Sequence, residues 1–262
     1  MKNNTRFIID AMQWSYSRLT AYNQCPYSFY LKYVECNKGD ENFYAQYGSF
    51  VHKILEKYAK DELSLFDLSS YYEEHYYEEV TCPAPPNKFS DIGQSYYEKG
   101  LDFLENIDLD LENYKILGVE KEVTFNVDRY TLIGFIDLLL KDRNGNIIIL
   151  DHKSGSLKTT KNGTISKTSE EHFESYKRQL YLYSIPVIEE YGQPPQKLKW
   201  NLFKDRKYIE VEFNENEFEQ AKQWVTDTIH SIEKDINFCP NPSAYFCNNI
   251  CDMRNCACEY KP

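Results

Sequence analysis

Two acidic residues interrupt the apolar runs between positions 133 and 155. Asp137 follows the apolar stretch that begins at Ile133, and Asp151 follows a second stretch that begins at Ile147. A buried carboxylate is costly unless a cation lies beside it. Lys153 supplies one cation, because side chains two residues apart on a strand share a face. Grouped carboxylate oxygens are also ligands that Mg²⁺ and Mn²⁺ prefer.

A polar loop at 142–146 separates the two runs and contains Asn-Gly, a strong hairpin signal. With the loop centred on Asn144, Asp137 lies opposite Asp151, because both are equally far from the centre. A two-residue turn would shift the register by one and place His152 opposite Asp137 instead. We therefore predict a loop of three or five residues, with His152 facing away from Asp151.

The chemistry that such a group supports is phosphodiester hydrolysis. A bound metal ion activates water and neutralises charge on the phosphate, and Lys153 adds a second positive charge. The alternative is structural: Asp137 and Asp151 end their strands, and Lys153 is solvated. Asp-x-Lys is a short and common string, so the pattern alone leaves both interpretations open.

Composition narrows the classes of protein to consider. The chain has 262 residues, 42% of them hydrophobic, enough for one large domain or two small ones. Its net charge of −11 gives no general affinity for nucleic acid, so a DNA contact needs a local basic strip or a metal-loaded site. The start of the chain is polar and no apolar run reaches 18 residues, which predicts a cytoplasmic protein without a membrane partner.

The eight cysteines favour metal binding over a disulfide framework, because the chain shows no secretory signal. Five of them crowd the last 24 residues: Cys239, Cys247, Cys251, Cys256 and Cys258. Closely spaced thiolates suit zinc and iron–sulfur clusters alike, and the spacing does not decide between them. Cys25, taken alone, is best explained as a buried thiol.

Two predicted helices carry further polar residues. The stretch Asn42–Leu63 has apolar residues at helical spacing, with His52 at the edge of the apolar face. A lone helical histidine is more often structural than a metal ligand. The second helix is Glu170–Tyr191, in which Gln179 and Tyr183 are four residues apart and share a face.

The order of predicted elements indicates an α/β protein with a central mixed β-sheet flanked by helices. Strands are expected at 116–127, in the hairpin, at 197–204 and at 207–213, and a long helix at 215–234. We expect three segments: an N-terminal helical region at 1–110 that carries Cys25 and His52, a sheet-containing core at 111–236, and a Cys-rich tail at 237–262.

Four short motifs follow one another along the chain: Gly48-Ser-Phe-Val-His52, Gly134-Phe-Ile-Asp137, Asp151-His-Lys153 and Gln179-x-x-x-Tyr183. Together they resemble the PD-(D/E)XK nucleases of the RecB-like branch. The Asn-Gln-Cys25-Pro sequence and the C-terminal cysteines resemble the iron–sulfur subset of that branch, which includes CRISPR-associated exonucleases and nuclease domains of helicase–nuclease complexes. The resemblance extends from Ser15 to Cys258, nearly the whole chain.

The resemblance implies a restriction-endonuclease-like core with a catalytic Mg²⁺ or Mn²⁺. Lys153 is then expected to position or activate the attacking water and to stabilise the pentavalent phosphate. Gln179 and Tyr183 are expected to orient Lys153 or the DNA backbone. The implied metal ligands are His52, Asp137, Asp151 and the main-chain carbonyl of His152.

The same resemblance implies a [4Fe–4S] cluster that ties the first and last segments together. The implied ligands are Cys25, Cys247, Cys251 and Cys256. In the family, the C-terminal cysteines usually run Cys-x-x-Cys with a third cysteine about five residues later. This chain departs from that spacing, so Cys258 or Cys239 is an alternative ligand and zinc an alternative metal.

The function implied is a metal-dependent DNA exonuclease that acts on single-stranded or frayed ends, in recombination, repair or CRISPR-type DNA processing. Other recombination or CRISPR proteins are possible partners, and oligomers occur among relatives. One alternative is a non-catalytic DNA-binding or assembly subunit. The sequence speaks against it, because every catalytic position is filled. An RNA nuclease is a second alternative.

Overall fold

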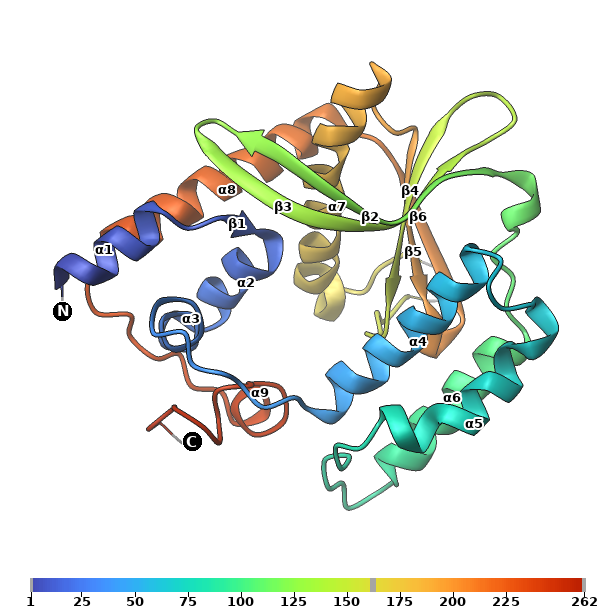
Figure 1. The fold of residues 1–262 in the computed structure, drawn as a ribbon, viewed down its shortest axis with the longest axis horizontal. Coiled ribbons are helices and arrows are strands. Elements are labelled where there is room, and N and C mark those ends of the chain that lie inside the picture. The colour runs from blue at the N-terminus through green and yellow to red at the C-terminus, as the bar shows by residue number, and fades with distance from the viewer. Residues whose placement is uncertain (1, 161–163, 261–262) are drawn as a thin grey trace. The chain divides into compact units, whose positions relative to one another are not determined.

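A computed structural model describes residues 2–160 and 164–260 (Figure 1). The chain forms two compact units, each drawn from separate stretches. Unit 1 comprises Met1–Asn42, Thr124–Gly134 and Glu219–Pro262, and unit 2 comprises Phe43–Val123 and Phe135–Phe218. The N-terminal and Cys-rich segments therefore both contribute to unit 1. The three-segment division at 110 and 236 stays a prediction about independent domains.

The sheet is mixed, as expected from the sequence. The described strands are β1 (Trp14–Ser15), β2 (Lys115–Val127), β3 (Tyr130–Lys141), β4 (Ile147–Lys153), β5 (Lys197–Leu202) and β6 (Lys207–Glu212). Their order is β1-β3-β4-β5-β6, with β2 paired to β3. The β3–β4 and β5–β6 pairs are antiparallel, whereas β4–β5 is parallel. These strands with their flanking helices confirm the predicted α/β class.

The hairpin of β3 and β4 has the predicted register. Leu138 pairs with Leu150 and Lys141 with Ile147, which leaves a five-residue loop at 142–146. Continued by one step, this register sets position 137 across from position 151. Asp142 holds the loop, since its carboxylate accepts hydrogen bonds from the backbone amides of two loop residues. These bonds, with the side chain of Asn146 contributing most, lower the pKa of Asp142.

In the described part of the chain, four α-helices belong wholly to unit 2: α4 (Phe43–Ala59), α5 (Leu68–Glu79), α6 (Ile92–Glu105) and α7 (Glu170–Tyr191). Helix α4 buries its apolar face in a core rich in tyrosine, which includes the fully buried Tyr47 and Tyr72. It ends earlier than predicted because Asp61 adopts a positive φ of 58°. Helix α7 contacts β4 and β5, and its bounds agree with the sequence prediction.

Unit 1 contains helices α1 (Lys2–Asp10), α2 (Tyr16–Gln24), α3 (Pro26–Phe29) and α9 (Ala244–Asn249), and most of α8 (Glu215–Lys234). Ser15 caps α2, because its hydroxyl accepts a hydrogen bond from the Arg18 amide at 3.2 Å. Strand β1 pairs in parallel with the start of β3. No helix in the described part of the chain is long and apolar enough to cross a membrane.

Candidate active site

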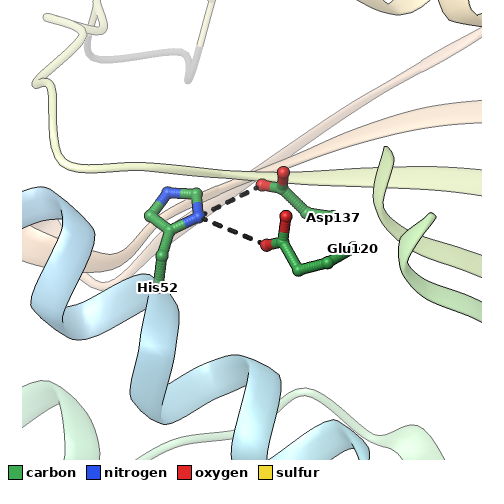
Figure 2. Close-up of side chains that lie close together, drawn as sticks. All are labelled: His52, Glu120 and Asp137. Carbon is green, nitrogen blue, oxygen red and sulfur yellow. Dashed lines mark ion pairs between the residues drawn. The ribbon is translucent and has the colours of Figure 1, made fainter. Parts of the chain in front are cut away.

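Three side chains from different elements of unit 2 converge on one point (Figure 2). His52 comes from α4, Glu120 from β2 and Asp137 from β3. The His52 Nδ1 lies 3.6 Å from Asp137 Oδ2 and 4.0 Å from Glu120 Oε1. One ligand atom from each residue lies within 4.8 Å of the other two. One nitrogen and two carboxylate oxygens at this spacing suit a divalent cation.

A backbone contact fixes the orientation of the His52 ring. Its Nε2 lies 2.9 Å from the main-chain carbonyl oxygen of His152. Because a carbonyl only accepts hydrogen bonds, Nε2 carries a proton, and in the neutral ring Nδ1 keeps its lone pair. Nδ1 therefore faces Glu120 and Asp137 as a potential metal ligand. A hydrogen bond from the other ring nitrogen to a carbonyl typically orients a ligating imidazole.

The electrostatics of this group favour a bound cation. Burial and the neighbouring Asp151 raise the pKa of Asp137 to about 7. Burial opposes charge on His52, yet the carboxylates of Glu120 and Asp137 raise its pKa overall. Crowded negative charge of this kind is relieved when a divalent cation binds. The residues present therefore fit Mg²⁺ or Mn²⁺.

Asp151 lies beside this group and is only 3% exposed. The Lys153 ammonium donates a hydrogen bond to its Oδ1 at 3.0 Å. Its buried Oδ2 lies 2.8 Å from the same nitrogen but accepts no hydrogen bond from the described residues. This oxygen thus retains lone pairs for another ligand. That Asp151 binds the same metal stays a prediction.

Lys153 is held by residues of α7. Its Nζ donates to Gln179 Oε1 at 2.9 Å, and the Gln179 amide donates to the Tyr183 hydroxyl at 3.4 Å. Burial disfavours the Lys153 ammonium, but Asp151 and Asp137 raise its pKa above the usual value. The raised pKa favours the ammonium form of Lys153, which cannot accept a proton. That Lys153 acts in catalysis through its charge stays a prediction. The Gln-x-x-x-Tyr motif does reach this lysine.

His152 contributes its backbone to the site. Its amide donates to Asp137 Oδ2 at 2.7 Å, and its carbonyl accepts from His52. Its ring points to the other face, where Nδ1 accepts a hydrogen bond from Asn201 at 3.0 Å. Burial lowers the pKa of this imidazole well below its usual value, so the ring is neutral. Ligation of the metal by the His152 carbonyl stays a prediction.

Glu120 is the residue that the sequence reasoning missed. It lies within β2 but has a positive φ of 46°, so the regular alternation of the strand breaks there. A break of this kind is typical of a bulge, which re-aims a side chain. The irregular alternation over 116–127 was the available signal for this residue.

A cavity of about 450 Å³ opens beside His52 and Glu120. His52 and Glu120 line it together with other residues of α4 and with Ser154, which follows β4. The small residues Ala45, Gly48 and Ser49 of α4 also line it. The site therefore opens into a space large enough to admit part of a substrate.

The cysteines of unit 1 form a second group of possible ligands. All eight cysteines of the chain are free. Burial raises the pKa of Cys258, and Cys25, Cys247 and Cys256 lie near enough to add to the rise. Cys251 is buried, with its sulfur 3.7 Å from the Ser28 hydroxyl. The structure thus gathers Cys25 with the C-terminal cysteines, Cys258 included.

These cysteines do not outline a closed zinc site. Zinc–sulfur bonds of about 2.3 Å in a tetrahedron set the sulfurs about 3.8 Å apart. Among the residues that the structure describes, no three cysteine sulfurs lie within 4.8 Å of one another. The donor set still has the right chemistry for thiolate-bound iron or zinc, and both metals stay open.

Comparisons with known proteins agree with this fold. The family model of the PD-(D/E)XK nuclease superfamily matches residues 13–259. An uncharacterized protein of Rickettsia typhi is 27% identical in an alignment of 157 positions that covers 52% of this chain and 18% of that protein. The chain therefore spans less than a fifth of the length of this curated relative.

A solved structure extends the comparison to the whole fold. A proposed exonuclease from Eubacterium rectale superposes with a TM-score of 0.56 over 95% of this chain and 90% of its own. The sequences are 12% identical, so the likeness concerns the fold alone. It supports a restriction-endonuclease-like arrangement of sheet and helices.

Proposed function

Because the chain belongs to the PD-(D/E)XK nuclease superfamily, we propose that it is a metal-dependent exonuclease acting on single-stranded or frayed DNA ends. The observation that carries the proposal is the convergence of His52, Glu120 and Asp137 next to the Asp151–Lys153 pair. Within the superfamily, the four motifs favour the RecB-like branch. We propose DNA ends, rather than RNA, as the substrate.

The residues divide the work as follows. His52, Glu120 and Asp137 would hold Mg²⁺ or Mn²⁺, with Asp151 as a further ligand. The bound cation supplies a water of lowered pKa and neutralises charge on the phosphate. The Lys153 ammonium stabilises the charge that develops on the phosphate, and Gln179 holds this ammonium in place.

Charge supports an enzyme that acts at ends. A chain with a net charge of −11 repels a DNA duplex, so sliding along it is disfavoured. A single strand threaded to a metal-loaded site meets positive charge where cleavage occurs. The alternative is a non-catalytic subunit that binds or assembles DNA-processing proteins. The filled set of site residues, with Lys153 held on two sides, favours the enzyme.

The test is an assay on end-labelled single-stranded DNA, duplex DNA and RNA, with Mn²⁺ or Mg²⁺ against EDTA. The protein is purified without oxygen, and Asp151→Ala is run in parallel. We expect metal-dependent shortening of single-stranded DNA that the variant lacks. Folded wild-type protein that cleaves no substrate would contradict the enzyme and favour the subunit, and preferential cleavage of RNA would change the substrate.

We propose a second cofactor, which the cysteines of unit 1 would bind. A [4Fe–4S] cluster is held by Cys25 and three of the C-terminal cysteines, with Cys247, Cys251 and Cys256 as our first choice. Cys258, which lies near Cys25, Cys247 and Cys256, and Cys239 are the alternatives to Cys256. Iron, acid-labile sulfide and zinc are measured in protein purified without oxygen. Stoichiometric zinc in a colourless protein would contradict the iron proposal.

We also propose a cellular setting and partners for this nuclease. A nuclease of this kind would work in the cytoplasm, where thiolates stay reduced. Recombination or CRISPR proteins would deliver the DNA ends, and an oligomer is compatible with such a role. Co-purification from the native host, followed by size determination, tests these partners.

A further inference from the structure

One aromatic side chain at the site has no part in the proposed reaction so far. Tyr176 lies on α7, three residues before Gln179, and is half-buried. The Lys153 Nζ lies 5.2 Å from the centroid of its ring. An ammonium at this distance from a tyrosine ring is attracted to the ring electrostatically. Tyr176 therefore adds a contact on Lys153 beyond Asp151 and Gln179.

Gly155 lies against the same ring from the other element. It follows β4, two residues after Lys153. A Cβ built at Gly155 would lie 2.3 Å from the Tyr176 hydroxyl oxygen and 3.6 Å from the ring carbon Cζ that bears it. Carbon and oxygen atoms that are not bonded do not approach to 2.3 Å. Any side chain at 155 would therefore displace the tyrosine.

Displacing the Tyr176 hydroxyl would also change the contact between the ring and Lys153, because the tyrosine ring is rigid. The hydroxyl cannot move without moving the ring, which has only two side-chain torsions. His172 limits this movement, since its ring centroid lies 4.5 Å from that of Tyr176. A shift of the hydroxyl away from Gly155 thus changes where the ring meets the ammonium of Lys153.

Resting on the proposed nuclease activity, we infer that Tyr176 is a positioning residue for Lys153 and that Gly155 leaves the space its hydroxyl occupies. Contact with the ring restricts the position of the ammonium, and this position sets its distance from a bound phosphate. The pair therefore acts on the rate of the chemical step through Lys153. It makes no contribution to metal binding, because neither residue belongs to the ligand group.

A structural role and a positioning role predict different results. If Tyr176 only packs α7 against the strand end, its loss lowers the melting temperature and affects kcat, KM and metal affinity together. If it positions Lys153, its loss lowers kcat while KM and the Mn²⁺ affinity stay near those of the wild type.

The test uses a double-mutant cycle of Gly155→Ala and Tyr176→Phe. Gly155→Ala should lower kcat roughly tenfold on end-labelled single-stranded DNA with Mn²⁺. Tyr176→Phe keeps the ring face, so it should retain far more activity than Tyr176→Leu. The double variant should recover most of the lost rate, because the atom that the new Cβ meets is gone. Tyr176→Leu, which lacks the ring, should lose activity as Gly155→Ala does.

Matched controls separate the effect from general damage. Gly93→Ala is the control for the added methyl group, since its Cβ meets no atom closer than 3.4 Å. Tyr77→Phe is the control for the lost hydroxyl, because Tyr77 is 71% exposed. Both should keep the wild-type kcat and melting temperature.

A second readout does not depend on cleavage. In protein labelled with ¹³C-lysine, the ε-CH₂ signal of Lys153, assigned with Lys153→Arg, should show the upfield shift that an aromatic ring face produces. Gly155→Ala and Tyr176→Leu should remove this shift, while Tyr176→Phe and the double variant should retain it. Unchanged Lys153 signals in the first two variants would overturn the inference, as would a double variant no better than Gly155→Ala. An inactive wild type that shows the expected NMR pattern would refute the nuclease alone.

Discussion

The two groups of possible metal ligands are held in place in different ways. In unit 2, His52, Glu120 and Asp137 project from a helix and two strands, whose backbones are fixed by hydrogen bonding and a large buried core. In unit 1, four of the C-terminal cysteines lie on a short helix and in the segment after it, and among the described residues no three cysteine sulfurs lie within 4.8 Å of one another. The carboxylate site is therefore organised before metal binds, whereas a cluster would itself organise the cysteines.

Loss of Lys153 should have the largest effect on the unit 2 site. Lys153→Ala removes the half-buried ammonium that faces Asp151, and we expect kcat to fall roughly 100- to 1,000-fold. The fold should persist, because the elements around it are packed without it. Cleavage rates and circular dichroism check the two halves of this statement. Cleavage at the wild-type rate would show that the site lies elsewhere.

Loss of Cys25 tests the other side of the comparison. If the cluster organises unit 1, Cys25→Ser should bleach the protein and lower its melting temperature by roughly 5 °C or more. Cys36→Ser is the matched control, because Cys36 is exposed. Iron content and thermal unfolding under nitrogen are the measurements. An iron-loaded Cys25→Ser protein with unchanged stability would remove Cys25 from the ligand set.

Loss of Glu120 should weaken metal binding without harming the fold. Glu120→Gln replaces one charged ligand by a neutral one, and we expect Mn²⁺ affinity to fall by roughly 10- to 100-fold. The melting temperature without metal should stay or rise, since crowded negative charge is reduced. Isothermal titration with Mn²⁺ measures the affinity. A drop in stability as large as that of Cys25→Ser would abolish the contrast between the two regions.

The pH dependence gives the smallest and most graded effect. Because the pKa of Asp137 is about 7, a proton competes with the metal below that pH, and Mn²⁺ affinity should fall up to tenfold per pH unit. The raised pKa values of Asp137 and His52 have the same sign for stability. Metal-free protein binds more protons folded than unfolded, so these groups stabilise it at low pH and lose that effect as pH rises through about 7.

Asp137→Asn separates these groups from the rest of the protein. The variant should raise the stability of the metal-free protein near neutral pH by about 1 to 3 kcal/mol, because a buried charge is removed. It should also lose cleavage. Unfolding by denaturant at several pH values measures the effect. Equal pH dependence in the variant and the wild type would show that Asp137 is not the titrating group.

The hairpin could be predicted from the sequence because its geometry is repetitive. A strand alternates with period two and a symmetric loop fixes the register, so the opposition of Asp137 and Asp151 followed from counting. The bounds of α7 followed from its long helical pattern for the same reason. Local regularity was sufficient wherever it continued for several residues.

The sequence did not predict the positions of residues that lie outside regular helix and strand patterns. Glu120 reaches the metal ligands through a positive φ inside a strand, and a sequence pattern of period two assigns such a residue to the wrong face. Helices α1 and α9 are only nine and six residues long, so each repeats the helical period few times. The position of Cys258 among the other cysteines depends on turns after α9, which spacing along the chain does not determine.

The central claim is that His52, Glu120 and Asp137 hold the catalytic cation. Anomalous diffraction from crystals soaked in Mn²⁺ tests it most directly, because manganese is located without reference to activity. We expect one strong anomalous peak bounded by His52 Nδ1 and the carboxylates of Glu120 and Asp137, and none in crystals of Asp137→Asn. A peak elsewhere in the chain, or an equal peak in the variant, would contradict the account.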